Sequence, residues 1–161
     1  MAKYYSTKTY GNDRGLSCCF RQWRATHSHC STLHGYSIGI KLVFECDTLD
    51  DKNWCMDFGG LKEFKAWADD TFDHTLVIAE DDPHLATFQK LNEIGGGFND
   101  SGICDLRIVP GVGCEMFAKL CYEKMSELLD SGDMRYPINP TVRVKSVEVF
   151  EHAGNSATYE G

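Results

Sequence analysis

The stretch His34-Gly-Tyr-Ser-Ile-Gly-Ile-Lys-Leu-Val-Phe44 is the most regular pattern in the chain. Residues two apart on a strand point to the same face of a sheet. One face therefore carries six side chains, namely His34, Tyr36, Ile38, Ile40, Leu42 and Phe44. The pattern predicts a long strand with one buried face, and it places two polar rings at the end of that face.

The segments around this strand predict a mixture of strands and helices without regular alternation. Residues 1–15 are polar and rich in turn-forming residues, the segment 71–79 contains a turn into a short apolar run, and 92–102 is a flexible glycine-rich loop. The remaining predicted elements are strands over 16–24, 54–58, 104–109 and 142–151, and helices over 61–72, 83–91 and 114–129. This order indicates an α+β fold with a largely antiparallel sheet. A change of phase near Lys145 and Ser146 predicts a β-bulge or burial on both faces in the last strand.

Length and charge limit the classes of protein to which the chain can belong. Its 161 residues suit one domain, residues 1–161, with a hydrophobic core. With 16 basic and 24 acidic side chains the formal net charge is −8, which disfavours nucleic acid as a partner. No apolar stretch is long enough to span a bilayer, and the first residues lack a secretion signal. We therefore expect a cytoplasmic protein that does not bind membranes and whose eight cysteines are reduced.

Half of the six histidines lie in one short segment, Thr26-His-Ser-His-Cys-Ser-Thr-Leu-His34. Imidazole and thiolate are the ligands that zinc prefers, and a catalytic zinc needs three protein ligands and one open position. His27, His29 and His34 are therefore candidate metal ligands. The alternative is a polar loop whose histidines are solvated.

Three further groups are candidates for chemistry. Cys30 lies beside these imidazoles and is a candidate nucleophile or general base, or else a fourth ligand that closes a structural zinc site. Asp73 and His74 could relay protons if they meet Cys30 in space, and otherwise form a surface turn. Glu151 could accept two parallel N–H bonds from a flat guanidine-like heterocycle, or simply face water at the end of a strand.

Taken together, these motifs resemble the 6-pyruvoyl-tetrahydropterin and 6-carboxy-tetrahydropterin synthase family. The segment from Cys30 to Tyr36 is similar to the family's Cys-x-x-x-His-Gly-His. Four other segments match family motifs in the same order, namely Asp57–Lys62, Phe72–His74, Gly113–Ala118 and the strand from Val147 to Tyr159 that carries Glu151.

The resemblance implies a fold, an assembly and an activity. The fold would be a tunnelling fold, with a four-stranded antiparallel sheet and two helices packed on one face. Subunits would form a homohexamer, a dimer of trimers, with active sites between them. The activity would be a zinc-dependent lyase reaction that converts 7,8-dihydroneopterin triphosphate to 6-carboxy-5,6,7,8-tetrahydropterin, acetaldehyde and triphosphate, for queuosine and deazapurine synthesis.

The same resemblance implies roles for particular residues. Zinc would polarise the side-chain hydroxyls of the substrate. Cys30 would move protons with Asp73 and His74 as its relay, and Glu151 would hold the pterin ring.

The chain departs from the family pattern at two places. Tyr36 replaces the second histidine of His-Gly-His, and the segment 20–24 contains no histidine where the family has its first ligand. His27 and His29 are expected to substitute, with His34, as the zinc ligands. A 6-pyruvoyl-tetrahydropterin synthase and a non-catalytic module that binds pterin or metal are the alternative functions.

Overall fold

The structure, a computed structural model, describes residues 2–161 and is built on one seven-stranded mixed sheet. The strand order is β5-β4-β2-β3-β6-β7, and β1 also pairs with β3. The strands are β1 (Tyr4–Tyr10), β2 (Leu16–Phe20), β3 (His34–Cys46), β4 (Thr75–Ala79), β5 (Leu106–Val109), β6 (Arg143–His152) and β7 (Asn155–Glu160). Helices α1 (Lys62–Phe72), α2 (Leu85–Asn92) and α3 (Cys114–Ser131) pack around it.

The long strand β3 organises the sheet, as its alternation predicts. Its even positions from Ile38 to Phe44 are almost fully buried. One edge of β3 pairs with β2 at its beginning and with β1 farther along, and the other edge pairs with β6. All of these pairs are antiparallel. The two polar rings at its beginning, His34 and Tyr36, lie opposite Phe20 and Cys18 of β2 and face the same side as the core.

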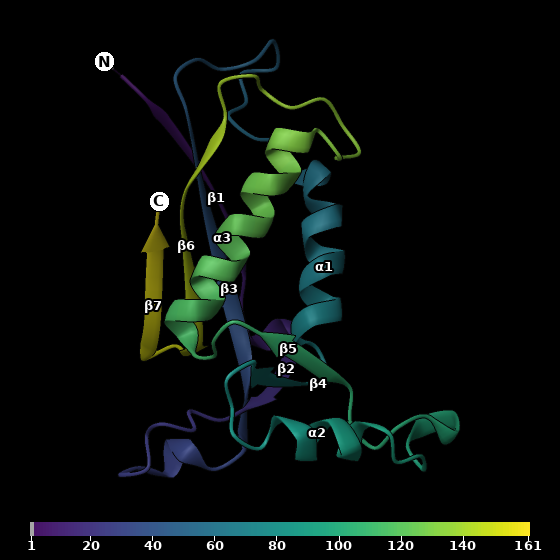
Figure 1. Ribbon diagram of the computed structural model, residues 1–161. Coiled ribbons are helices and arrows are strands. Elements are labelled where there is room, and N and C mark those ends of the chain that lie inside the picture. Colours follow the sequence, from purple (N-terminus) through teal and green to yellow (C-terminus); the bar gives the residue numbers. More distant parts are fainter. Residues whose placement is uncertain (1) are drawn as a thin grey trace.

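Two helices cover one face of the long strands. Figure 1 shows α3 running across the long strands with α1 beside it, whereas α2 lies at the far end of the molecule below β4 and β5. Phe117 of α3 joins the layers, because its ring centroid lies 5.1 Å from those of both Phe20 and Phe72. Of the described residues, none belongs to a helix long and apolar enough to cross a membrane.

The prediction of four antiparallel strands and two helices is wrong in number and in direction. β4 pairs with β2 and with β5 in parallel, and α2 covers its second face. Val77 and Ala79 of β4 belong to the main core, whereas Leu76 and Ile78 pack against Phe88 of α2. Burial on both faces is typical of strands in a parallel arrangement, and it leaves no alternation in the sequence.

The outer strands were not predicted because their sequences are polar. Most residues of β1 and β7 are exposed or half-buried, so neither strand carries an apolar alternation. The strand predicted over 54–58 is also wrong, because Asp57 caps a 3-10 turn there by accepting a hydrogen bond from the N–H of Gly59. The predicted bulge in β6 is confirmed, since Val144 and Ser146 pair with adjacent residues of β3 and leave Lys145 between them.

Candidate functional site

His34 stands at the first position of β3, and its ring orientation is fixed. Its Nδ1 lies 2.6 Å from the carbonyl oxygen of Thr32. Because a carbonyl only accepts, Nδ1 carries the proton and Nε2 keeps its lone pair. The ring packs against Phe20 at 5.6 Å and edge-on against Tyr36 at 5.3 Å between centroids. This arrangement leaves Nε2 available as a base or as a ligand.

His27 and His29 lie in the exposed loop that leads to β3, and their side chains do not join His34 in a cluster. Within residues 2–161, no group of three or more His, Cys, Asp or Glu side chains is placed to hold a metal ion. The donor set as arranged in one chain therefore does not fit the tetrahedral site expected for zinc. Zinc binding by His27, His29 and His34 stays a prediction.

Tyr36 lies where several candidate groups converge. Burial raises the pKa of its phenol above the ordinary value, and the nearby Glu151, Cys30 and Cys114 raise it further. The hydroxyl therefore stays protonated at neutral pH and can donate a hydrogen bond. Cys114, the first residue of α3, has its thiol pKa raised to about 11 by burial and by the carboxylates of Glu151 and Glu115.

Glu151 has a free carboxylate beside these groups. Among residues 2–161 its side-chain oxygens have neither a hydrogen bond nor a salt bridge, although the side chain is half-buried. A partly desolvated carboxylate without a partner is suited to a ligand that offers two parallel N–H groups. Tyr36 and Glu151 thus provide a donor and an acceptor at the same end of the sheet.

The loop that carries His27 to Cys30 is anchored at its beginning by an ion pair. The Arg21 guanidinium donates two hydrogen bonds to Asp82, at 2.8 and 2.6 Å, and the Asp82 carboxylate is 1% exposed. Gln22 then donates from its backbone to the carbonyl of Cys30 at 2.8 Å and from Nε2 to the carbonyl of Val112 at 2.8 Å. The loop is therefore held against the segment that precedes α3.

Asp73 and His74 contact each other through their side chains. His74 Nδ1 lies 2.9 Å from a carboxylate oxygen of Asp73, which also accepts a hydrogen bond from the backbone of Ser17 at 3.2 Å. The carboxylate fixes the tautomer and leaves Nε2 of His74 free. His74 is 85% exposed and has a φ of 56°, in the left-handed region that costs about 1 kcal/mol for a residue with a Cβ.

The structure does not bring this pair to Cys30. The Cys30 thiol is exposed near Tyr36, whereas His74 borders a cavity with Asn92, Phe98 and Ile103. No hydrogen bond within residues 2–161 joins Cys30 to Asp73 or His74, since the Cys30 backbone bonds to Ser28 and Gln22 and the Asp73–His74 pair bonds to Ser17. One chain therefore presents two separate halves of the predicted relay.

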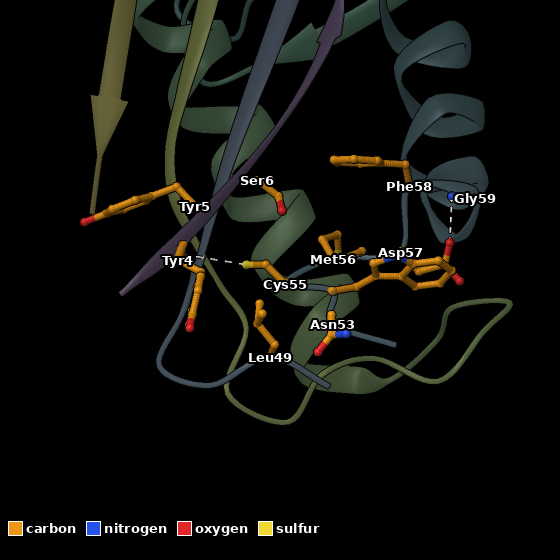
Figure 2. A pocket seen from close by; sticks show the side chains of 11 residues that line it. Tyr4, Tyr5, Ser6, Leu49, Asn53, Cys55, Met56, Asp57, Phe58 and Gly59 are labelled. Atoms are coloured by element: carbon orange, nitrogen blue, oxygen red, sulfur yellow. Dashed lines mark hydrogen bonds between the residues drawn. The ribbon is translucent and has the colours of Figure 1, made fainter. Parts of the chain in front are cut away.

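Another cavity lies far from these residues. It has a volume of about 460 Å³ and opens between the start of β1 and the segment before α1. Figure 2 shows Tyr4, Cys55, Met56 and Phe58 around it. Tyr4 pairs with Cys46, the last residue of β3, so this cavity is roughly 40 Å along the strand from His34. None of the predicted site residues lines it.

Three residues of the candidate site were not predicted from the sequence. Cys114 and Gln22 owe their positions to the start of α3 and to the loop after β2, and Asn12 reaches Glu151 from the turn after β1. Asn12 and Gln22 stand in segments without periodicity, and the periodicity of α3 predicts burial of Cys114 but no role in a site.

The chain is similar to known proteins over nearly its whole length. A family model described as 6-pyruvoyl tetrahydropterin synthase matches residues 12–161. A 6-carboxy-5,6,7,8-tetrahydropterin synthase from Aquifex aeolicus is 24% identical over 131 residues, which cover 81% of this chain and 75% of that protein. The enzyme of the same name from Rickettsia conorii is 32% identical over 57 residues, or 35% of this chain and 41% of that protein.

Solved structures share the fold. An uncharacterised protein from Wolinella succinogenes superposes with a TM-score of 0.73 at 20% identity, covering 100% of this chain and 99% of that one. A catalytic-residue mutant of the 6-pyruvoyltetrahydropterin synthase of Plasmodium vivax gives a TM-score of 0.66 at 15% identity, with the same coverage. From the motifs in order, the shared fold and the match over residues 12–161, the chain belongs to the 6-pyruvoyl tetrahydropterin synthase family of enzymes.

Proposed function

We propose that this protein is a pterin side-chain lyase that converts 7,8-dihydroneopterin triphosphate and one molecule of water to 6-carboxy-5,6,7,8-tetrahydropterin, acetaldehyde and triphosphate. The observation that carries the proposal is the free carboxylate of Glu151 beside Tyr36 and Cys30. A pterin presents a flat edge with a ring N–H and an amino group, which matches a carboxylate in two parallel bonds. The names of the curated relatives support the carboxy product.

In this proposal each group of the chain has one task. Glu151 holds the ring edge, and the protonated Tyr36 hydroxyl donates to an oxygen of the substrate. Cys30 moves protons on the substrate side chain. Asp73 orients His74, whose Nε2 exchanges the proton with Cys30 across the interface of a homo-oligomer, because a single chain keeps the two halves apart.

The test is incubation of the purified protein with 7,8-dihydroneopterin triphosphate, with and without added zinc, followed by mass spectrometry of the products. The proposal expects 6-carboxytetrahydropterin and acetaldehyde, and their loss in a Cys30→Ala variant. Formation of a 6-pyruvoyl product would instead support the second activity of the family.

A non-catalytic pterin-binding module is the other candidate. It is favoured by Tyr36 in place of a family histidine and by the lack of a three-donor cluster among the described residues. Saturable pterin binding without product formation, under every metal condition tried, would support it over the lyase.

A further inference from the structure

Glu151 stands in an irregular part of the β6–β7 hairpin. Phe150 pairs with Ser156 and His152 pairs with Asn155, so the register shifts and Glu151 has no partner residue on β7. Such a bulge re-aims the side chain of the extra residue and disrupts the ladder locally. The backbone groups that the bulge removes from the ladder need other hydrogen-bond partners.

The side chain of Asn12 donates to backbone carbonyl oxygens at this bulge. Its Nδ2 lies 2.8 Å from the carbonyl oxygen of Ser37, 3.2 Å from that of Phe150 and 3.3 Å from that of Glu151. The two hydrogens of the amide are thus shared among three acceptors. In return, the Ser37 hydroxyl donates to the carbonyl of Asn12 at 2.6 Å. Asn12 therefore binds the neighbour of Tyr36 and the backbone of Glu151 together.

Asn12 can reach both strands because the residue of β3 that it passes has no side chain. It lies in the turn between β1 and β2, on one edge of β3, whereas Glu151 belongs to β6 on the other edge. The residue of β3 in between is Gly39, which pairs with Phe150. A Cβ on Gly39 would lie 3.3 Å from both the backbone nitrogen and Oδ1 of Asn12, and 3.1 Å from the carbonyl of Tyr10. Glycine permits this close approach.

We propose that Asn12 is a positioning residue that fixes the direction of the Glu151 carboxylate relative to Tyr36. The inference rests on the proposed function, since it assumes that Glu151 holds a pterin. Two parallel bonds to a flat ring edge require the carboxylate to lie in the plane of that ring. Without the hydrogen bonds from Asn12, the bulge samples more orientations. Ligand binding then has to order it first, at a cost in binding free energy.

A second asparagine offers a matched control. Asn139 Nδ2 donates to the carbonyls of Thr48 and Trp54, at 2.7 and 3.2 Å, and so clamps a loop in the same manner at the opposite end of β3. The Asn139→Ala variant loses comparable hydrogen bonds to backbone carbonyls, at a position far from Glu151. It therefore reports what a merely structural asparagine contributes.

The experiment measures binding of neopterin by fluorescence titration, and stability by urea unfolding, for five proteins. These are the wild type, Asn12→Ala, Asn139→Ala, Glu151→Gln and the double variant Asn12→Ala/Glu151→Gln. We expect Asn12→Ala to raise the Kd about tenfold and Asn139→Ala to leave it unchanged at a similar loss of stability. In the Glu151→Gln background, the effect of Asn12→Ala on the Kd should largely disappear.

The outcomes separate the two proposals. Additive effects of the two substitutions, or equal Kd values for Asn12→Ala and the wild type, overturn the positioning role while leaving the proposed function in place. A wild type that binds no neopterin and turns over no dihydroneopterin triphosphate overturns the proposed function, and the positioning role with it. As a second variant, Gly39→Ala presses on Asn12 without changing it and should also weaken neopterin binding.

Discussion

At the scale of single residues, the candidate site combines a carboxylate without a partner and two groups held in their neutral forms. Glu151 raises the pKa of both Tyr36 and Cys114, and burial raises them as well. A proton donor and a charged acceptor therefore coexist near neutral pH. This combination is suited to a ligand whose ring donates N–H bonds and whose side chain carries hydroxyl groups.

Replacement of Glu151 by Gln tests the acceptor. The amide keeps the shape of the side chain but removes the charge, so we expect pterin affinity to fall by about 1.5–3 kcal/mol, or roughly ten- to a hundred-fold in Kd. Glu148→Gln is the control on the same strand, because the Glu148 carboxylate bonds to Ser156 instead. Equal affinities for the two variants in the fluorescence titration would contradict the role of Glu151.

Replacement of His34 by Ala tests the predicted zinc site. We expect His34→Ala to lose bound zinc and activity together, since His34 is the one predicted ligand fixed within the sheet. His84→Ala removes an exposed imidazole outside the loop and is the control. Calorimetric titration of the metal-free proteins with zinc gives the affinity, and full zinc occupancy in His34→Ala would refute the ligand assignment.

At the scale of secondary-structure elements, two contacts hold the site in place. The aromatic contacts of Phe117 fasten α3 to β2 and α1, and the Arg21–Asp82 pair fastens the histidine loop to the end of β4. The first is a core contact and the second a nearly buried ion pair. Removal of the first contact should lower the free energy of unfolding, and removal of the second should also change how that free energy depends on pH.

Phe117→Ala should destabilise the protein by about 3–5 kcal/mol, because it removes a fully buried ring and leaves a cavity between three elements. Phe98→Ala makes the same chemical change at a ring that is 87% exposed, and should cost less than about 0.5 kcal/mol. Urea unfolding measures both changes. A small effect of Phe117→Ala would show that α3 is not part of the cooperative core.

Asp82→Asn should change how stability depends on pH. Burial opposes ionisation of Asp82, but hydrogen bonds from Arg21 and from the backbone of His84 outweigh it and hold the pKa below the ordinary value. The ionised carboxylate therefore stabilises the fold above about pH 4, and this contribution is lost as the pH falls through the lower folded-state pKa. At pH 7 the variant should be about 3–5 kcal/mol less stable than the wild type.

The difference between Asp82→Asn and the wild type should shrink in urea unfolding curves recorded below about pH 4. Asp81→Asn is the control, since its ion pair with Arg24 is exposed to solvent and should add little to stability at any pH. A constant difference across the pH range would show that the Asp82 charge is not the cause.

At the scale of the whole molecule, the separation of Cys30 from Asp73 and His74 is the main consequence of the fold. Cys30 lies in the loop between β2 and β3, whereas Asp73 and His74 lie between α1 and β4. β1 and β7 leave unpaired strand edges in the isolated chain, and such edges are a template for pairing with another copy. On these grounds we propose a homo-oligomer whose active sites lie between subunits.

Mixing two inactive variants tests this assembly. Co-expressed Cys30→Ala and His74→Ala chains should recover part of the wild-type activity, because some interfaces combine an intact Cys30 from one copy with an intact His74 from another. Cys30→Ala mixed with Glu151→Gln is the control and should show no gain over the separate variants, since both lesions fall in the same half of the site. Light scattering after size-exclusion chromatography gives the oligomeric state, and a monomer that is active would refute the shared site.

Local patterns predicted the parts of the fold whose burial is one-sided. The alternation from His34 to Phe44 and the stripes of α1 and α3 are confirmed because each of these elements has one face in the core. The residues of β4 are buried on both faces of the strand, and those of β7 are exposed or half-buried on both. Neither strand therefore has a periodic sequence pattern that reveals its pairing. The parallel part of the sheet was missed for this reason.

The sequence by itself determined the family, the central strand and the residue types of the site, because motif order and periodicity are written along the chain. Only the tertiary structure decided which of these residues meet. It brought Asn12 across Gly39 to the bulge at Glu151, and it kept His74 apart from Cys30. Such contacts join residues distant in sequence, so they depend on the pairing of strands and not on any local preference.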